Sequence, residues 1–331
     1  MKAFTFLFCL ICILPICNAQ YNEATIIPNA IVYTSLKEAL RNPKKVVNLR
    51  LRDQDLREIP SAILSMKNLE TLDLAGNQIK EITEENLWGL SKLRYINLSE
   101  NQIQKIHPHA FLRCYDLAEL DLGNNRINEV AFLTKLKYLS TLYLNNNKIK
   151  NFDLPKLKMR YLKFFRADAN LLTEIPSFLQ HSTKLKLLNL YDNQIENLNL
   201  EQFNINQLFY LNVGNNPLQA INSIVRLNAL ETLILDWIDL GKMESELSTI
   251  TQLGQLQILS LENCNISQLP EDIGQLQRLK EASFIANQLK QLPTSFFELK
   301  RLEKLWLLQN PLYLVVESQL KSGLPNCEIK L

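Results

Sequence analysis

The feature that most restricts the fold of this chain is a pattern of aliphatic residues and asparagine that recurs at a short, nearly constant interval. One copy, Leu185 to Leu198, reads LKLLNLYDNQIENL. Twelve copies begin at Lys45, Asn68, Lys92, Asp116, Tyr138, Tyr161, Lys184, Gln207, Ala229, Gln255, Arg278 and Arg301. A fixed period of this kind is typical of solenoids, in which each short unit buries its apolar face only against its neighbours.

Alternating residues within each copy predict a short β-strand. Leu188 and Leu190 are two positions apart, so both side chains face one side of the strand, whereas Asn189 and Tyr191 face the other. Leu185 turns inward where the coil closes. We therefore expect parallel strands stacked about 4.8 Å apart.

An asparagine follows the predicted strand in most copies, among aliphatic residues. The chain turns off the strand here, and several backbone N–H and C=O groups would be buried without partners. A side-chain amide both donates and accepts, so one asparagine can bond the backbone of its own and adjacent coils. We expect a structural ladder of Asn77, Asn101, Asn125, Asn147, Asn170, Asn193, Asn216, Asn287 and Asn310. Gln54, Ile238 and Cys264 occupy the same position in the other copies, and of these the Cys264 thiol is a weak donor.

These copies resemble the leucine-rich repeat family, whose pattern is L-x-x-L-x-L-x-x-N/C-x-L. The resemblance implies an α/β repeat fold, a right-handed solenoid or horseshoe with a parallel β-sheet on its concave side. Ala167 and Ala282 stand at positions usually taken by leucine, so we expect looser packing in their copies.

The ends of the chain are most similar to those of secreted bacterial members of the family. Ser35 and Glu38 form a predicted capping box at the start of a short helix, and Gly323 ends a predicted helix that a final short strand follows. The predicted parts are a signal peptide (1–19), an N-terminal cap (20–44), the repeats (45–315) and a C-terminal cap (316–331).

The segment from Met1 to Ala19 has the pattern of a secretory signal peptide. Lys2 precedes an apolar run from Phe4 to Cys17, and the small residue Ala19 follows. The run is too short to span a bilayer comfortably. We expect cleavage after Ala19 and a secreted, periplasmic or cell-surface protein. Retention of the signal or lipid attachment at Cys17 is the alternative, and only these would tie the chain to a membrane.

Composition argues against several classes of function. Lys and Arg total 36 against 34 Asp and Glu, a balance that disfavours nucleic-acid binding. With three histidines, eight glycines and no known catalytic motif, we expect no enzyme activity, no cofactor and no metal site. The His107–His109 segment (HPH) lacks further ligands nearby and is expected to form a turn. Cys114, Cys264 and Cys327 are expected to be packing residues.

Large side chains gather at the predicted solvent-facing positions of the central copies. They are Tyr143, Phe164, Arg166, Leu187, Tyr191 and Tyr210. Apolar groups in a groove with an arginine are typical of protein-binding hot spots, although scattered exposed apolar residues are also normal. A weaker candidate lies at Ile285, Trp306 and Leu308. We expect non-catalytic binding of a protein partner of unknown identity on the concave face. Glycan binding and a purely structural role at the cell surface remain alternatives.

Overall fold

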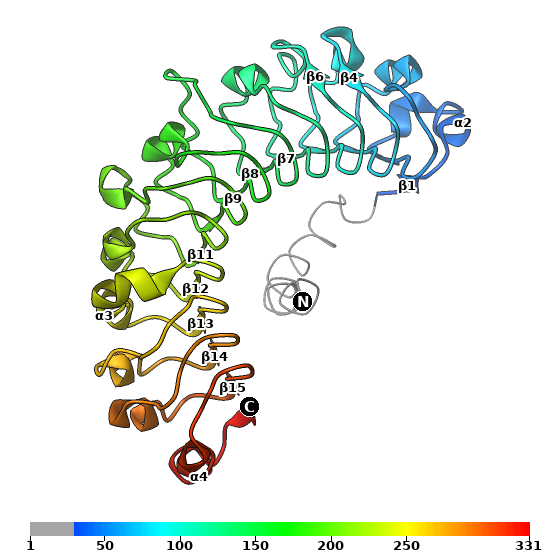
Figure 1. The fold of residues 1–331 in the computed structure, drawn as a ribbon. Coiled ribbons are helices and arrows are strands. Elements are labelled where there is room, and N and C mark those ends of the chain that lie inside the picture. The colour runs from blue at the N-terminus through cyan, green and yellow to red at the C-terminus, as the bar shows by residue number, and fades with distance from the viewer. Residues whose placement is uncertain (1–29) are drawn as a thin grey trace. The chain divides into compact units, whose positions relative to one another are not determined.

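The computed structural model describes residues 30–331, so the predicted signal peptide and residues 20–29 lie outside the described range. The chain forms two compact units that meet in sequence at Ile149 and Lys150. Each unit consists of repeated coils with a short strand on one side and, in most coils, a helix on the other (Figure 1). No helix within residues 30–331 is both long and apolar enough to cross a membrane.

The strands of the first unit form a parallel sheet. Their order across the sheet is β1 (Val32–Tyr33), β2 (Asn48–Arg50), β3 (Thr71–Asp73), β5 (Tyr95–Asn97), β7 (Glu119–Asp121) and β8 (Thr141–Tyr143). A second, two-stranded parallel sheet joins β4 (Glu81–Ile82) to β6 (Lys105–Ile106). Equivalent repeat positions pair with each other, as Leu49 with Leu72 and Leu72 with Ile96. The sheet register therefore follows the repeat.

The second unit repeats this arrangement. Its strands are β9 (Phe164–Arg166), β10 (Leu187–Asn189), β11 (Tyr210–Asn212), β12 (Thr232–Ile234), β13 (Ile258–Ser260), β14 (Glu281–Ser283), β15 (Lys304–Trp306) and β16 (Glu328–Lys330). Each pairs in parallel with the next, and Phe165, Leu188 and Leu211 occupy one row of the core. These rows of buried side chains hold successive coils together, because a single coil leaves both of its flat faces open.

Most helices are single 3₁₀ turns. In the first unit they are η1 (Pro43–Lys45), η2 (Ser61–Ser65), η3 (Glu85–Leu87) and η4 (Ala131–Lys135), together with the α-helix α2 (Leu36–Ala39). In the second they are η5 (Ser177–His181), η6 (Leu200–Gln202), η7 (Asn222–Arg226), η8 (Leu240–Glu246), η9 (Ile273–Gln275) and η10 (Thr294–Glu298), with α3 (Ser248–Thr251) and α4 (Leu314–Gly323). The longest copy, which begins at Ala229, contains both η8 and α3.

The described ends of the chain each add a strand to a sheet. Ser35 caps α2, and its hydroxyl oxygen accepts a hydrogen bond from the Glu38 N–H at 3.4 Å. The preceding strand β1, which the sequence did not reveal, pairs with β2. At the other end α4 stops at Gly323 as predicted, and the predicted final strand is β16, which pairs with β15.

The asparagine that follows the strand in most copies bonds to the backbone of its own and a neighbouring coil. Asn193 Nδ2 donates to the carbonyl oxygens of Leu190 in its own coil and Ala167 in the preceding coil, both at 3.0 Å. Its Oδ1 accepts from the Leu172 N–H at 2.9 Å. Asn101 in the first unit makes the equivalent contacts with Leu98, Leu74 and Ile79. Each amide therefore pairs turn groups that no strand partner reaches.

The residue before the ladder position has a left-handed backbone in every copy. The positive φ values, all between 50° and 70°, belong to Asp53, Gly76, Glu100, Asn124, Asn146, Ala169, Asp192, Asn215, Trp237, Asn263, Ala286 and Gln309. Only one of these is glycine, although glycine adopts this conformation without steric cost. The tight turn into the ladder thus imposes strain that the surrounding hydrogen bonds offset.

The first prediction concerns the ladder. Asn193→Ala should lower the free energy of unfolding by about 3 kcal/mol or more, because it leaves buried backbone groups of Leu172, Ala167 and Leu190 without partners. The exposed Asn204→Ala should change it by less than about 0.5 kcal/mol. Urea unfolding followed by circular dichroism measures both. Equal midpoints for the two variants would contradict a structural role for the ladder.

The second prediction concerns the strained turn. Ala169→Gly should raise the free energy of unfolding by about 0.5–1 kcal/mol, because glycine relieves the positive φ of 52°. The same change at Ala131, the first residue of η4 and not a positive-φ position, should lower it. Thermal unfolding midpoints decide the sign. A lower midpoint for Ala169→Gly would show that φ does not limit stability there.

Candidate functional site

We call the solvent side of the strands the strand face; its side chains alternate with those of the core. In the second unit, Phe164, Leu187 and Tyr210 pair side by side on this face of β9, β10 and β11. Phe164 is half-buried, but Leu187 is 3% exposed and Tyr210 1%. The expectation that all three would be solvent-exposed is wrong for Leu187 and Tyr210. Side chains one strand apart are close enough to cover each other.

Tyr143, another large residue of that prediction, belongs to β8 in the first unit and is 8% exposed. It too is buried, contrary to the expectation of an exposed ring. The second unit alone therefore holds the other five residues of the predicted patch, and its exposed part is smaller than the sequence indicated.

Three side chains of the predicted patch keep partial exposure: Phe164, Arg166 and Tyr191. The Arg166 guanidinium donates two hydrogen bonds, both 3.0 Å, to the carboxylate of Asp168 two residues later. The Tyr191 ring lies against Gly214, where a β-carbon added to the glycine would come within 3.2 Å of the ring. The guanidinium and the ring are thus held in position by their own neighbours. We refer to Phe164, Arg166 and Tyr191 as the aromatic–arginine patch.

The weaker candidate near the C-terminal end is also half-buried at each of its positions, Ile285, Trp306 and Leu308. Beside it, Lys304 and Glu281 on neighbouring strands form an ion pair at 2.8 Å. This region combines apolar and charged side chains without a concentration of one charge.

The strand face of the first unit is charged. Asp73, 6% exposed, pairs with Arg52 at 2.5 Å and lies 3.5 Å from Arg50. Burial, aided by the negative charges of Asp73 and Asp121, raises the pKa of the neighbouring Tyr95. Arg50 and Arg52 are offset by the acidic residues Asp73 and Asp121 on later strands, so this face lacks the excess of cations that a phosphate backbone requires.

Two buried carboxyl groups lie on the strand face of the second unit. Asp236 and Glu262 are 2% and 0% exposed. Ser260 Oγ donates to Asp236 Oδ1 at 2.7 Å, and Ser283 Oγ donates to Glu262 Oε1 at 2.5 Å. Burial, with a further contribution from the charge of Asp236, raises the pKa of Glu262 to about 8. Burial and the neighbouring carboxyl group therefore favour the protonated form of Glu262.

The described thiols are poor nucleophiles. Burial raises the pKa of Cys114 to about 12 and that of Cys327 to about 11, and it raises the pKa of Cys264 as well. The Cys264 thiol instead donates to the Leu235 carbonyl oxygen at 3.2 Å, in the position of a ladder asparagine. A cysteine that acts as a nucleophile needs a lowered pKa, because the thiolate is the reactive form.

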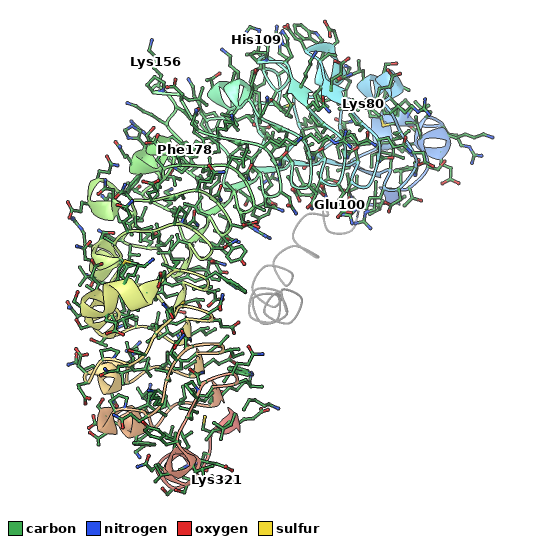
Figure 2. The ribbon with its side chains drawn as sticks, in the orientation of Figure 1. Lys80, Glu100, His109, Lys156, Phe178 and Lys321 are labelled. Carbon is green, nitrogen blue, oxygen red and sulfur yellow. The ribbon has the colours of Figure 1, made fainter. Side chains whose placement is uncertain are left out.

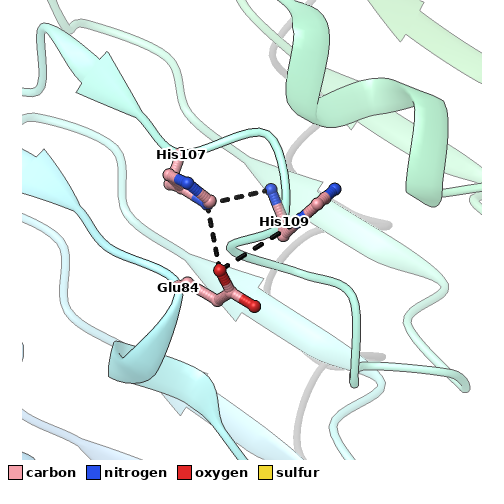
Figure 3. Close-up of side chains that lie close together, drawn as sticks. All are labelled: Glu84, His107 and His109. Carbon is pink, nitrogen blue, oxygen red and sulfur yellow. Dashed lines mark hydrogen bonds and ion pairs between the residues drawn. The ribbon is translucent and has the colours of Figure 1, made fainter.

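The HPH segment forms a turn, in which the His109 N–H donates to His107 Nδ1 at 3.2 Å. The structure adds a neighbour from the preceding coil, Glu84 (Figure 3). Glu84 Oε2 is 3.7 Å from His107 Nδ1 and 4.0 Å from His109 Nδ1. Sequence spacing concealed this group because its third member comes from another coil.

Comparison with models of protein families identifies the same repeat. Two overlapping matches to "Leucine rich repeat" cover residues 44–103 and 96–149, and "Leucine Rich Repeat" matches residues 255–276. The chain thus carries leucine-rich repeats over residues 44–149 and 255–276. Its similarity to curated leucine-rich repeat relatives includes keratocan from Danio rerio, 31% identical over 162 residues, or 47% of this chain and 45% of keratocan.

Another curated relative is adenylate cyclase from Schizosaccharomyces pombe, 28% identical over 256 residues. The match covers 72% of this chain but only 15% of the cyclase. This chain thus spans less than half the length of either relative, and the cyclase activity is not transferred to it.

Solved leucine-rich repeat structures share the fold. An internalin, inlF from Listeria monocytogenes, is 23% identical with a TM-score of 0.76, covering 89% of this chain and 86% of the internalin. The FLRT2 repeats in an octameric complex with latrophilin 3 and Unc5D are 22% identical with a TM-score of 0.59. The match covers 93% of this chain and 88% of the solved chain. The plant peptide hormone receptor RGFR1, solved in complex with RGF2, is 23% identical with a TM-score of 0.59. The match covers 85% of this chain and 50% of the receptor chain.

The third prediction follows from the raised pKa of Glu262. Between its ordinary value near 4.5 and about 8, folded Glu262 keeps a proton that the unfolded chain has released, so stability falls as pH rises through this window. Glu262→Gln removes that titration, so its stability relative to the unsubstituted chain should increase from pH 5 to pH 8.5. Exposed Glu271→Gln should show no such trend. Urea unfolding midpoints measured across this pH range test the prediction. A constant difference between the midpoints of Glu262→Gln and the unsubstituted chain would refute it.

Proposed function

We propose that the chain is a secreted, non-catalytic solenoid that binds a protein partner through the strand face of its second unit. The aromatic–arginine patch is the observation on which the proposal rests. Phe164, Arg166 and Tyr191 are partly exposed on one face, within two neighbouring coils. A partner covering them would remove two aromatic rings and a guanidinium from water, the groups most often found at binding hot spots.

The buried neighbours of the patch favour binding with little reorganisation. The buried Leu187 lies beside Phe164 on the neighbouring strand, and Asp168 holds the Arg166 guanidinium in a two-bond contact. Side chains that are already ordered lose less entropy when a partner binds. We therefore expect the patch to bind a folded protein surface or an extended peptide more tightly than its small exposed area alone suggests.

Secretion is supported by the signal-peptide pattern in residues 1–19. A protein partner is supported by two structures of the same fold, the RGFR1 complex with RGF2 and the FLRT2 assembly with latrophilin 3 and Unc5D. The absence of catalysis is supported by the thiols, whose pKa values are raised rather than lowered. Under this proposal the chain needs no cofactor.

The fourth prediction tests the patch. Phe164→Ala with Tyr191→Ala should weaken capture of the native partner at least tenfold, because it removes two aromatic contacts of the kind that each contribute more than about 1 kcal/mol at hot spots. Tyr161→Ala is the matched control, since this ring is 46% exposed in the same unit but lies outside the strands. The assay is co-purification from the native surroundings with quantitative mass spectrometry, followed by titration of the captured protein.

Three results would contradict the proposal. Capture that is equal for the double variant and Tyr161→Ala would place the interface elsewhere. Binding of defined oligosaccharides on a glycan array, abolished by the same double variant, would favour a lectin, because aromatic faces also stack on sugar rings. Recovery of no partner at all would favour a purely structural role.

A further inference from the structure

The Glu84–His107–His109 group lies where two coils of the first unit are joined edge to edge. Strands β4 and β6 pair Glu81 with Lys105, and the His107 N–H continues the pairing by donating to the Ile82 carbonyl oxygen at 2.9 Å. Glu84 follows one strand and the two histidines follow the other. The paired strands therefore fix the backbone on which all three side chains stand.

This group lies away from the strand face. Figure 2 shows His109 on the outer side of its coil, whereas Glu100, at the turn after a strand, lies on the inner side. The side chains of His107, His109 and Glu84 are 47%, 46% and 33% exposed. His107 also lines an open pocket of about 660 Å³ with Thr83 and Arg126. Solvent and ions thus reach the group without any movement of the coils.

We propose that Glu84, His107 and His109 bind a divalent transition-metal ion, with zinc as the best fit. One ligand atom from each of the three residues lies within 4.8 Å of the others. Two donors of a tetrahedral zinc ion, each about 2.05 Å from the metal, are about 3.3 Å apart. The observed 3.7 and 4.0 Å contacts of Glu84 must therefore contract by less than an ångström, which exposed side chains on a turn can supply.

The donor set selects the kind of metal. Two imidazoles and one carboxylate suit zinc and related first-row ions, whereas magnesium and calcium prefer oxygen ligands alone. Three protein ligands leave further coordination positions to water, as in zinc sites that are not purely structural. Binding through His107 Nδ1 would replace its hydrogen bond from the His109 N–H, while binding through Nε2 would retain it.

A metal at this position would link two consecutive coils. Glu84 belongs to the copy that begins at Asn68, and both histidines belong to the copy that begins at Lys92. The bound ion would add a cross-link beside β4 and β6, so zinc should raise the thermal unfolding midpoint. An ion pair between Glu84 and protonated histidines would need no metal, and the experiment distinguishes the two.

The fifth prediction is measured on the chain without a polyhistidine tag, after treatment with a chelator and in a Cys327→Ser background that removes the most accessible described thiol. Isothermal titration with zinc should give one ion per chain. His107→Ala, His109→Ala and Glu84→Gln should each weaken binding at least tenfold, because each removes one of three ligands. His181→Ala, the third histidine of the chain and a member of the second unit, should leave the affinity unchanged.

Thermal unfolding provides the second measurement. Without metal, the three variants should unfold near the midpoint of the parent chain, because the substituted side chains are only partly buried. Zinc should raise only the parent and the His181→Ala midpoints. Retention of the parent affinity by the His107→Ala, His109→Ala double variant would overturn the site. So would complete displacement of zinc by a hundredfold excess of magnesium, which imidazole ligands do not allow.

Discussion

The structure depends on satisfying the backbone polar groups that become buried where each coil leaves its strand. A buried N–H or C=O without a partner costs free energy comparable to a lost hydrogen bond, and a coil exposes several such groups at one point. The ladder asparagines meet this demand by bonding two coils at once, as Asn193 does with Ala167 and Leu190. The same bonds make neighbouring coils interdependent, so the repeated turn also holds the stack together.

The ladder changes between Asn216 and Asn287, and other irregular features gather in the same coils. Ile238 has no polar side chain, and Cys264 replaces the amide with a single weak donor. Helices η8 and α3 lie in the first of these coils, and the buried carboxyl groups of Asp236 and Glu262 lie on their strand face. Their hydrogen bonds with Ser260 and Ser283 supply links between coils that the missing amide does not. In these coils, polar contacts on the strand face thus take the place of the contacts that asparagine makes at the turn in the other coils.

Sequence alone predicted the strand within each repeat, the positions of the ladder and the helix that ends at Gly323, because local spacing determines each of them. It did not predict β1, β4 or β6, which lie outside the repeated strand position. It misjudged exposure at Leu187 and Tyr210, since burial there is set by side chains one repeat away. Ala167 and Ala282 are fully buried beside large core residues, Phe165 and Phe284, which supply volume in the same coils. The small and the large residue are two positions apart in each of these copies, so their side chains face the same side of the strand.

A solenoid converts a separation of one repeat in sequence into contact in space. Glu84 meets His107 in the next copy of the repeat, and Glu281 meets Lys304 in the same way. Sites on such a molecule are therefore composed along columns that run across coils, and motif searches along the chain pass over them. The core leucines and ladder asparagines are fixed by packing and hydrogen bonding, whereas each outward column can vary freely. The strand face at Tyr191 in one unit and the outer side of the coil at His107 in the other can thus acquire different ligands without disturbing the coils that carry them.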